Sequence, residues 1–178
     1  MEHKNPDNSN KIKKILTDNT RDIVFGFEDG FVSTLGTITG IAAATYDAYI
    51  VILSGAVLIL VESVSMAAGS YLSSKSQKEV VGEKIDEKNL LTGAVFMGVS
   101  YLTAGSVVIL PYLLFRIDLA IAASIILTII SLFLLGAVKG EIIKKPAFRS
   151  GLEMLFIAFT AAAIGFFAGQ LINYLFTR

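Results

Sequence analysis

Residues 49–72 read YIVILSGAVLILVESVSMAAGSYL, a run of 24 residues with a single charged side chain, Glu62. About 20 consecutive apolar residues are enough for an α-helix to cross the hydrocarbon core of a bilayer. The run therefore predicts a transmembrane helix. Four further apolar stretches of similar length accompany it, at residues 23–44, 90–115, 119–138 and 152–176.

The composition of the whole chain agrees with this interpretation. Of the 178 residues, 54% are hydrophobic and 17% are charged, and the mean hydropathy is +0.69. A soluble domain carries about a quarter charged residues. We therefore predict an all-α polytopic membrane protein whose five transmembrane helices occupy residues 21–178. Residues 1–20 form a polar cytoplasmic segment, for which a surface-lying helix and a disordered basic tail are alternatives.

Basic residues predict the orientation of the chain. Of the 15 lysines and arginines, 13 lie before the first apolar stretch, between the second and third, or between the fourth and fifth; the others are Arg116 and Arg178. Loops that remain in the cytoplasm are enriched in lysine and arginine. Five spans with this bias place the N-terminus in the cytoplasm and the C-terminus outside it.

Several classes of function are excluded by composition. The chain has no cysteine, so disulfides, thiolate metal sites and cysteine nucleophiles are absent. Its one histidine, His3, lies in the polar N-terminal segment, which argues against a zinc site and an intramembrane serine hydrolase. The formal net charge of zero implies no nucleic-acid surface. We expect neither enzymatic activity nor a cofactor.

Acidic residues within the apolar stretches are the candidate functional groups, because a carboxylate at membrane depth is costly unless it faces a partner or water. Asp29 follows Arg21 by eight residues, about 12 Å along a helix. Met66 precedes Lys75 by nine residues, at a similar depth, and Glu62 lies one turn deeper on the same face. Asp29, Glu62 and Met66 can therefore meet between two antiparallel helices. Residues with a possible accessory or proton-coupling role are Glu28, Ser70 and Glu153.

The chemistry of this set leaves two uses open. Carboxylates alone suit calcium, magnesium or protons, whereas an added thioether shifts the preference toward a softer cation such as Fe(II) or Mn(II). The same carboxylates could take up and release protons and couple transport to a gradient.

Small residues recur four positions apart in several of the predicted helices, a spacing that lets helix backbones approach closely in lipid. Packing within one subunit and a homodimer interface are alternatives for each pair. The pairs are Gly26/Gly30, Gly36/Gly40, Ser65/Gly69, Gly136/Gly140 and Gly165/Gly169.

Four sequence motifs resemble those of the vacuolar iron transporter family, in order from about residue 20 to the C-terminus. Residues 21–34 (RDIVFGFEDGFVST) resemble its first-helix signature, and residues 62–73 (ESVSMAAGSYLS) its second-helix motif. Residues 106–113 (SVVILPYL) are similar to its third helix. LGAVKG at 135–140 and RSGLEM at 149–154 are similar to its fourth loop and fifth helix.

This resemblance implies a homodimeric carrier in the bilayer that moves Fe(II), and often Mn(II), out of the cytosol in exchange for protons. It also implies that Asp29, Glu62 and Met66 form the membrane metal site. Two departures stand out. Ser70 replaces a glutamate of many members, and the short connection at residues 76–89 replaces a long cytosolic metal-binding insert.

Together these features predict a metal exporter without the insert, in a cell membrane or, in a eukaryote, a vacuolar membrane. Two rival functions remain. One is a carrier of another cation or a small solute on the same fold, which would not need the thioether of Met66. The other is a non-transporting membrane scaffold or partner protein, in which Asp29 and Glu62 could be neutralised without consequence.

Overall fold

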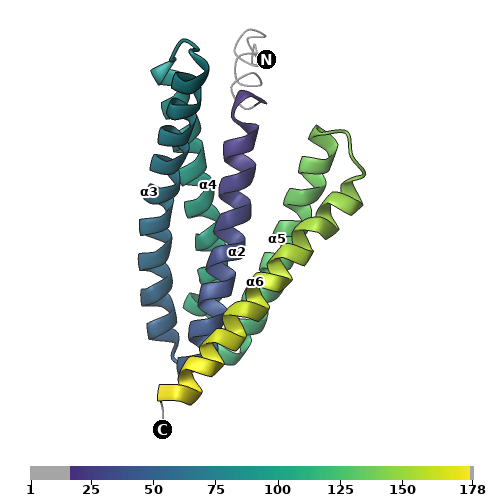
Figure 1. Ribbon diagram of the computed structural model, residues 1–178. Helices are drawn as coiled ribbons and strands as arrows, with labels where there is room; N and C mark the ends of the chain where they lie inside the picture. Colours follow the sequence, from purple (N-terminus) through teal and green to yellow (C-terminus); the bar gives the residue numbers. More distant parts are fainter. Residues whose placement is uncertain (1–16, 177–178) are drawn as a thin grey trace, which may run out of the picture.

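The computed structural model describes residues 17–176, and this part of the chain folds into long helices without a strand. The helices run up and down along the molecule and are joined by short connections (Figure 1). Their bounds are α2 (Thr20–Thr45), α3 (Ala48–Val81), α4 (Glu87–Leu114), α5 (Ile117–Ile142) and α6 (Ala147–Phe176). The fold class predicted from the sequence is confirmed, and the predicted N-terminal surface helix lies outside the described residues.

Four of the helices, α3 to α6, have the length and apolar composition of membrane spans. Their lipid-facing character is visible in the many exposed valine, leucine, isoleucine and phenylalanine side chains. The protein is therefore a polytopic membrane protein. The remaining predicted span, at residues 23–44, corresponds to α2. It is not in this group, although the 26 residues of α2 would reach about 39 Å. Glycines, threonines and two acidic residues interrupt its apolar sequence.

The polar helix α2 lies at the centre of the bundle and packs against all four of the others. Its neighbours bury much of it, including Phe31, Leu35, Ile38 and Ala42. A helix with this composition is stable at membrane depth because protein, rather than lipid, covers its polar groups. The position of α2 therefore explains how an acidic, glycine-rich segment can belong to a membrane domain.

The connections between helices are specified locally. After α2, Tyr46 adopts a left-handed conformation with φ of 52°, and the Asp47 side chain accepts hydrogen bonds from the backbone N–H groups of Tyr49 and Ile50 at 2.8 and 3.3 Å. Gly82, with φ of 74°, ends α3, and Asp86 caps α4 through the N–H of Asn89. These are standard helix-ending and helix-starting arrangements, and they hold α2, α3 and α4 as antiparallel neighbours.

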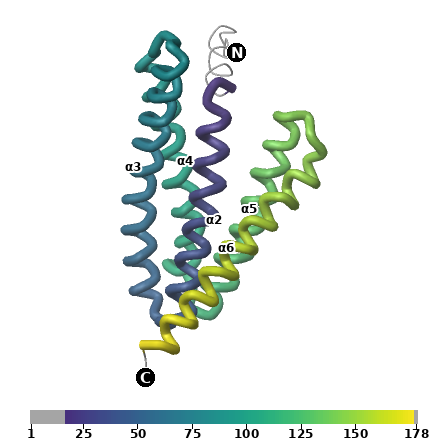
Figure 2. The backbone as a smooth tube through the Cα atoms, viewed as in Figure 1, coloured from purple at the N-terminus to yellow at the C-terminus, as the bar shows by residue number. Residues whose placement is uncertain are grey.

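The pair α5–α6 leans away from the other helices at the end that carries the α5–α6 connection (Figures 1 and 2). At the opposite end α6 crosses α2 with the two backbones in contact. A Cβ added to Gly40 would lie 2.5 Å from the Gly165 carbonyl oxygen, and one added to Gly165 or Gly169 would overlap the carbonyl of Gly36 or Gly40. Only glycine at these positions permits so close a crossing.

The small-residue pairs can now be assigned to partners. Gly26 and Gly30 face α4, and the pair Gly136/Gly140 faces the start of α6. With the α2–α6 crossing, four of the five predicted pairs pack within one chain. The exception is Ser65/Gly69 on α3, where nothing lies within 4 Å of a Cβ added to Gly69.

Candidate cation site

Two half-buried acidic side chains of neighbouring helices lie within electrostatic reach of each other. Asp29 belongs to α2 and Glu62 to α3, and both are half-buried. Their charges are close enough to interact, and the charge of Glu28 also acts on Asp29. The sequence predicted this meeting from the depth of each residue along its helix. The pair supplies up to four carboxylate oxygens at the α2–α3 interface.

Met66 is also half-buried and lies one helical turn from Glu62, toward the end of the molecule that holds the α3–α4 connection. Among residues 17–176, no three histidine, cysteine, aspartate or glutamate side chains gather into a metal-binding group. A cation held by Asp29 and Glu62 would therefore complete its coordination with neutral donors. The thioether of Met66, backbone carbonyls, hydroxyl groups and water are the available kinds.

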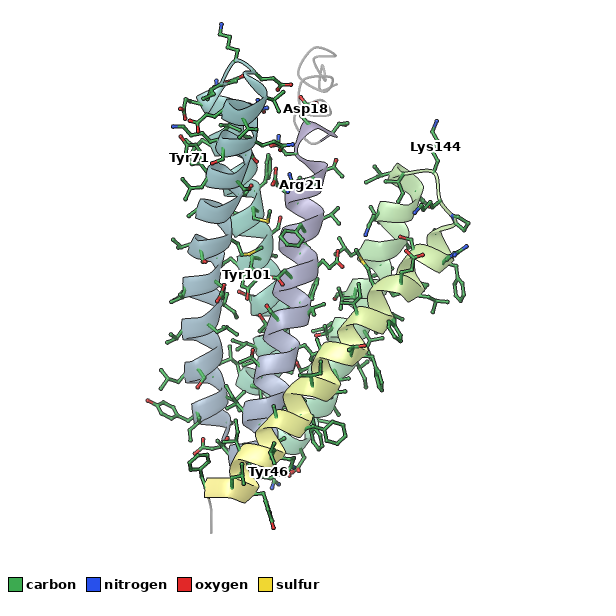
Figure 3. All side chains as sticks on the ribbon, viewed as in Figure 1. Asp18, Arg21, Tyr46, Tyr71, Tyr101 and Lys144 are labelled. Carbon is green, nitrogen blue, oxygen red and sulfur yellow. The ribbon has the colours of Figure 1, made fainter. Side chains whose placement is uncertain are left out.

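Tyr101 of α4 is a polar residue of this region that the sequence analysis missed (Figure 3). Its side chain is fully buried, and its hydroxyl lies 2.7 Å from that of Ser33 and within electrostatic reach of Asp29 and Glu62. The Ser33 hydroxyl in turn donates to the backbone carbonyl oxygen of Asp29 at 2.6 Å. A tyrosine in an otherwise apolar run, flanked by Ser100 and followed by Thr103, was the available sequence signal.

A second polar contact joins α2 to α3 two turns from Asp29. The buried hydroxyl of Ser70 donates to a carboxylate oxygen of Asp22 at 2.8 Å. A Cβ added to Gly93 of α4 would lie 2.7 Å from the other carboxylate oxygen, so three helices meet around Asp22. Ser70, predicted as an accessory residue of the site, thus binds a different carboxylate from those of the central pair.

The other two accessory candidates lie in different surroundings. Glu28 is half-buried next to Asp29 in the chain and is part of the same acidic group. Glu153 pairs with Arg149 at 3.7 Å, one turn away on the exposed surface of α6. The structure therefore keeps Glu28 close to the acid pair and gives Glu153 a partner of its own.

A small polar cluster holds α3 and α4 together near the connection between them. The Tyr71 hydroxyl donates to the carboxylate of Glu87, and the Lys75 ammonium lies 3.4 Å from the same carboxylate and 5.8 Å from the centre of the Tyr71 ring. Tyr71 is labelled near this end of the bundle in Figure 3. Glu87 is thus engaged in holding two helices together, and Asp86 in capping α4.

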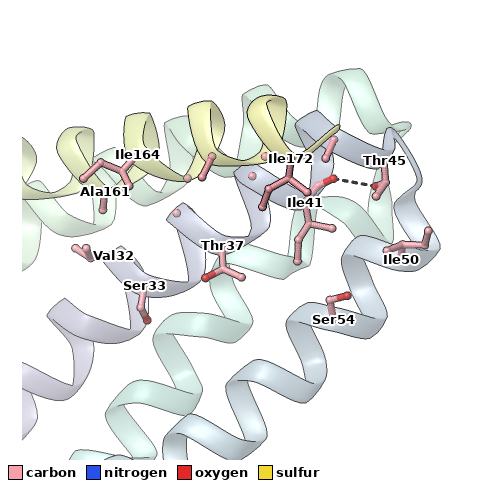
Figure 4. A pocket seen from close by; sticks show the side chains of 16 residues that line it. Val32, Ser33, Thr37, Ile41, Thr45, Ile50, Ser54, Ala161, Ile164 and Ile172 are labelled. Carbon is pink, nitrogen blue, oxygen red and sulfur yellow. Dashed lines mark hydrogen bonds between the residues drawn. The ribbon is translucent and has the colours of Figure 1, made fainter. Parts of the chain in front are cut away.

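Two grooves open on the α2 side of the bundle. One, of about 530 Å³, lies between α2 and α3, and Glu62 lines it together with Thr37 and Ser54. The other, of about 710 Å³, extends from Ser33 between α2 and α6 and is lined by apolar and small residues (Figure 4). Glu62 therefore lies at the border of a groove that extends from it toward the α2–α3 connection.

Comparison with known proteins gives a family match over most of the chain. Residues 20–92 and 81–170 match the sequence model of the VIT family. The two matched stretches meet in the α3–α4 connection. This is where a long insert was predicted to be missing.

Curated relatives agree with this match. "Vacuolar iron transporter 1" of Arabidopsis thaliana is 23% identical over 215 aligned positions, covering 86% of each chain. "Vacuolar iron transporter homolog 1" of the same plant is 30% identical over 168 positions, covering 86% of this chain and 82% of the relative. "Vacuolar iron transporter homolog 4" is 31% identical, covering 82% and 80%. The first alignment is longer than this chain, so that relative carries segments that this chain lacks.

Proposed function

This chain belongs to the VIT family, and from this premise we propose that it is a membrane carrier that moves Fe(II) or Mn(II) out of the cytosol in exchange for protons. Relatives named vacuolar iron transporter support transport of a metal. The observation that carries the proposal is the acid pair. Asp29 and Glu62 come from separate helices, are half-buried and lie within electrostatic reach of each other, and an unpartnered carboxylate inside a membrane is costly.

In the proposed mechanism Asp29 and Glu62 bind the cation and neutralise its charge. When the cation leaves, the two carboxylates repel each other, and a proton taken up by either one relieves that repulsion. Metal and protons would therefore compete for the same oxygens, which is the chemical basis of exchange. Met66 adds a soft donor that favours a transition metal over magnesium.

The decisive experiment is metal uptake by proteoliposomes that contain the purified protein. We expect saturable uptake of Fe(II), kept reduced, and of Mn(II), faster with an acidic lumen. Asp29→Asn and Glu62→Gln keep side-chain size, remove charge and should lose most of the uptake. Glu83→Gln, an exposed carboxylate in the α3–α4 connection, is the matched control and should retain it.

Both rival functions predict the absence of metal uptake in the same assay. A scaffold would give no uptake above empty liposomes. A carrier of another solute would give no metal uptake, and its acid pair would bind a different substrate. Full activity of both Asp29→Asn and Glu62→Gln would remove the case for a cation site at this pair.

Met66→Leu separates the roles of charge and softness. The substitution nearly conserves volume and removes only the sulfur. We expect it to reduce Fe(II) uptake more than it reduces the ability of magnesium to compete with that uptake. Combined with Asp29→Asn it should be scarcely worse than Asp29→Asn alone, because residues that share one ion are not additive. Equal effects on every cation would argue that Met66 only fills space.

We further propose that the carrier is a homodimer. The open face of α3 around Gly69 offers surface for a second copy. Cross-linking in the membrane through a cysteine at Gly69 would test this, because the chain has no other cysteine. Absence of a cross-linked dimer at any position along this face would contradict the proposal.

A further inference from the structure

The buried hydroxyl of Tyr101 has a defined direction of hydrogen bonding. A serine hydroxyl has one proton to donate, and Ser33 gives its proton to the carbonyl oxygen of Asp29 at 2.6 Å. The 2.7 Å contact between Ser33 and Tyr101 must then use the tyrosine proton. The result is a chain of two hydrogen bonds that runs from Tyr101 on α4, through Ser33, to the backbone of Asp29.

A second contact attaches the same turn of α2 to the same residue of α4. Gly30, the residue after Asp29, lies directly against the Tyr101 backbone: an added Cβ would be 2.8 Å from its carbonyl oxygen and 3.0 Å from its Cα. Tyr101 thus contacts the turn that follows Asp29 twice, at Gly30 by packing and at Ser33 by hydrogen bonding. The carboxylate of Asp29 projects from a turn whose position α4 fixes.

We propose that Tyr101 is a positioning residue of the cation site, which through Ser33 sets the distance between Asp29 and Glu62 and thereby the affinity for the divalent cation. This inference rests on the proposed function of the acid pair. The hydroxyl does not need to touch the ion. Small displacements of a ligand change metal affinity, because supporting hydrogen bonds hold ligands in coordination geometry.

The chain contains a matched control for this residue. Tyr112 lies eleven residues later, close to the same face of α4, and is also buried, with 3% of its surface exposed. It lies beside Ser124, whose hydroxyl donates to the carbonyl oxygen of Val108 at 2.8 Å. The same three kinds of group meet here as at Tyr101, but Ser124 of α5 donates to a carbonyl on the tyrosine's own helix, and that carbonyl belongs to an apolar residue.

The test compares Tyr101→Phe with Tyr112→Phe in two measurements: Mn(II) binding in detergent, followed by the electron paramagnetic resonance of free Mn(II), and the KM and kcat of uptake. We expect Tyr101→Phe to weaken Mn(II) binding and raise KM about three- to tenfold, the effect of one hydrogen bond, with kcat nearly unchanged. Tyr112→Phe should leave both at the wild-type values.

Ser33→Ala provides a second, independent criterion. If the two hydroxyls act in series, Ser33→Ala and the double variant should each match Tyr101→Phe. Wild-type affinity in Tyr101→Phe, an equal change in Tyr112→Phe, or additive effects of Ser33→Ala and Tyr101→Phe would overturn the inference. If the wild-type protein neither binds nor transports Mn(II) or Fe(II), the proposed function itself fails, which is a distinguishable result.

Discussion

Gly30 illustrates how one missing side chain organises the acid pair. Because it has no Cβ, α2 and α4 touch at the residue next to Asp29. A larger residue would displace Tyr101, and the turn that carries Asp29 would then lose its contacts with α4. The site is thus defined as much by this contact as by the acids themselves.

We predict that Gly30→Ala destabilises the protein. The added methyl group would lie 2.8 Å from both the Tyr101 carbonyl oxygen and the Ala104 Cβ, and overpacking of this kind costs about 1–3 kcal/mol. Thermal unfolding in detergent measures the effect. Gly69→Ala is the control: nothing lies within 4 Å of its new methyl group, and alanine is the better helix former. An unfolding temperature of Gly30→Ala equal to that of Gly69→Ala would show that the α2–α4 contact is not tight.

The Ser70–Asp22 hydrogen bond leads to a second prediction for single residues. Ser70→Ala removes the donor and leaves the half-buried Asp22 carboxylate without it, a loss of about 1–3 kcal/mol. Ser73→Ala is the comparison, since the Ser73 hydroxyl donates only to the backbone of its own helix at Ser70. Unfolding of both variants by heat, read from helical circular dichroism, should rank Ser70→Ala as the less stable. The opposite order would mean that Asp22 finds another partner.

Residue patterns predicted some of these interactions and not others. Asp29 and Glu62 stood out because a charge in an apolar run is conspicuous, and helix geometry was enough to place them within about one helical turn of each other in depth. Tyr101 did not stand out, because a tyrosine in a membrane segment is not unusual and its partner Ser33 is 68 positions away. Asp22 lies just before the first apolar stretch and was not singled out. Its contact with Ser70 depends on the angle between α2 and α3, which no local pattern contains.

At the scale of elements, apolar length predicted the five long helices of residues 17–176, but most of their ends were predicted too short. The sequence placed the second span at 49–72, whereas α3 continues to Val81, because lysine, glutamate and serine residues extend a helix beyond the membrane as well as apolar ones do. The neighbours of α2 were also beyond prediction. Glycine pairs indicate that a helix packs closely, and they do not indicate against which partner.

The α3–α4 connection gives a prediction at this scale. Glu79 and Glu83 are exposed, whereas Asp86 caps α4 and Glu87 contacts Tyr71 and Lys75. Changing Glu79, Glu83, Asp86 and Glu87 together to the corresponding amides should leave metal uptake nearly intact, since asparagine also caps helices and exposed ion pairs contribute little. The initial rate of Fe(II) uptake is the measurement. A many-fold loss would identify the connection as a site of metal capture.

At the scale of the whole molecule, the fold separates the segments rich in lysine and arginine, which were predicted to set the orientation of the chain in the membrane, from the other connections. The start of α2 and the α3–α4 and α5–α6 connections lie at one end, whereas the α2–α3 connection and the end of α6 lie at the other (Figure 1). Nine of the ten lysines and arginines among residues 17–176 lie in or near the segments at the first end, and the tenth is Arg116, between α4 and α5. This distribution favours a cytoplasmic location for the basic end.

Cysteine labelling tests that orientation directly, and the native chain contributes no background. A cysteine at Ser76, beyond the apolar part of α3, should react with an impermeant maleimide only from the cytoplasmic side. One at Arg116, between α4 and α5, should react only from the opposite side. Labelling of both positions from the same side would contradict the up-and-down arrangement in the membrane, and a reversed result would contradict the orientation.

The central place of α2 has a consequence for how the protein is made. The ribosome delivers α2 before any of the helices that cover it, and α2 is the helix whose composition least favours entry into lipid. Its acids gain their neighbours only after α3 has emerged, and Gly36 and Gly40 gain theirs only with residues 161–169 of α6. Insertion of α2 from the translocon is therefore completed by segments synthesised later. In a chain truncated before α6, the helix that carries Asp29 would stay partly uncovered, and quality-control proteases could degrade it.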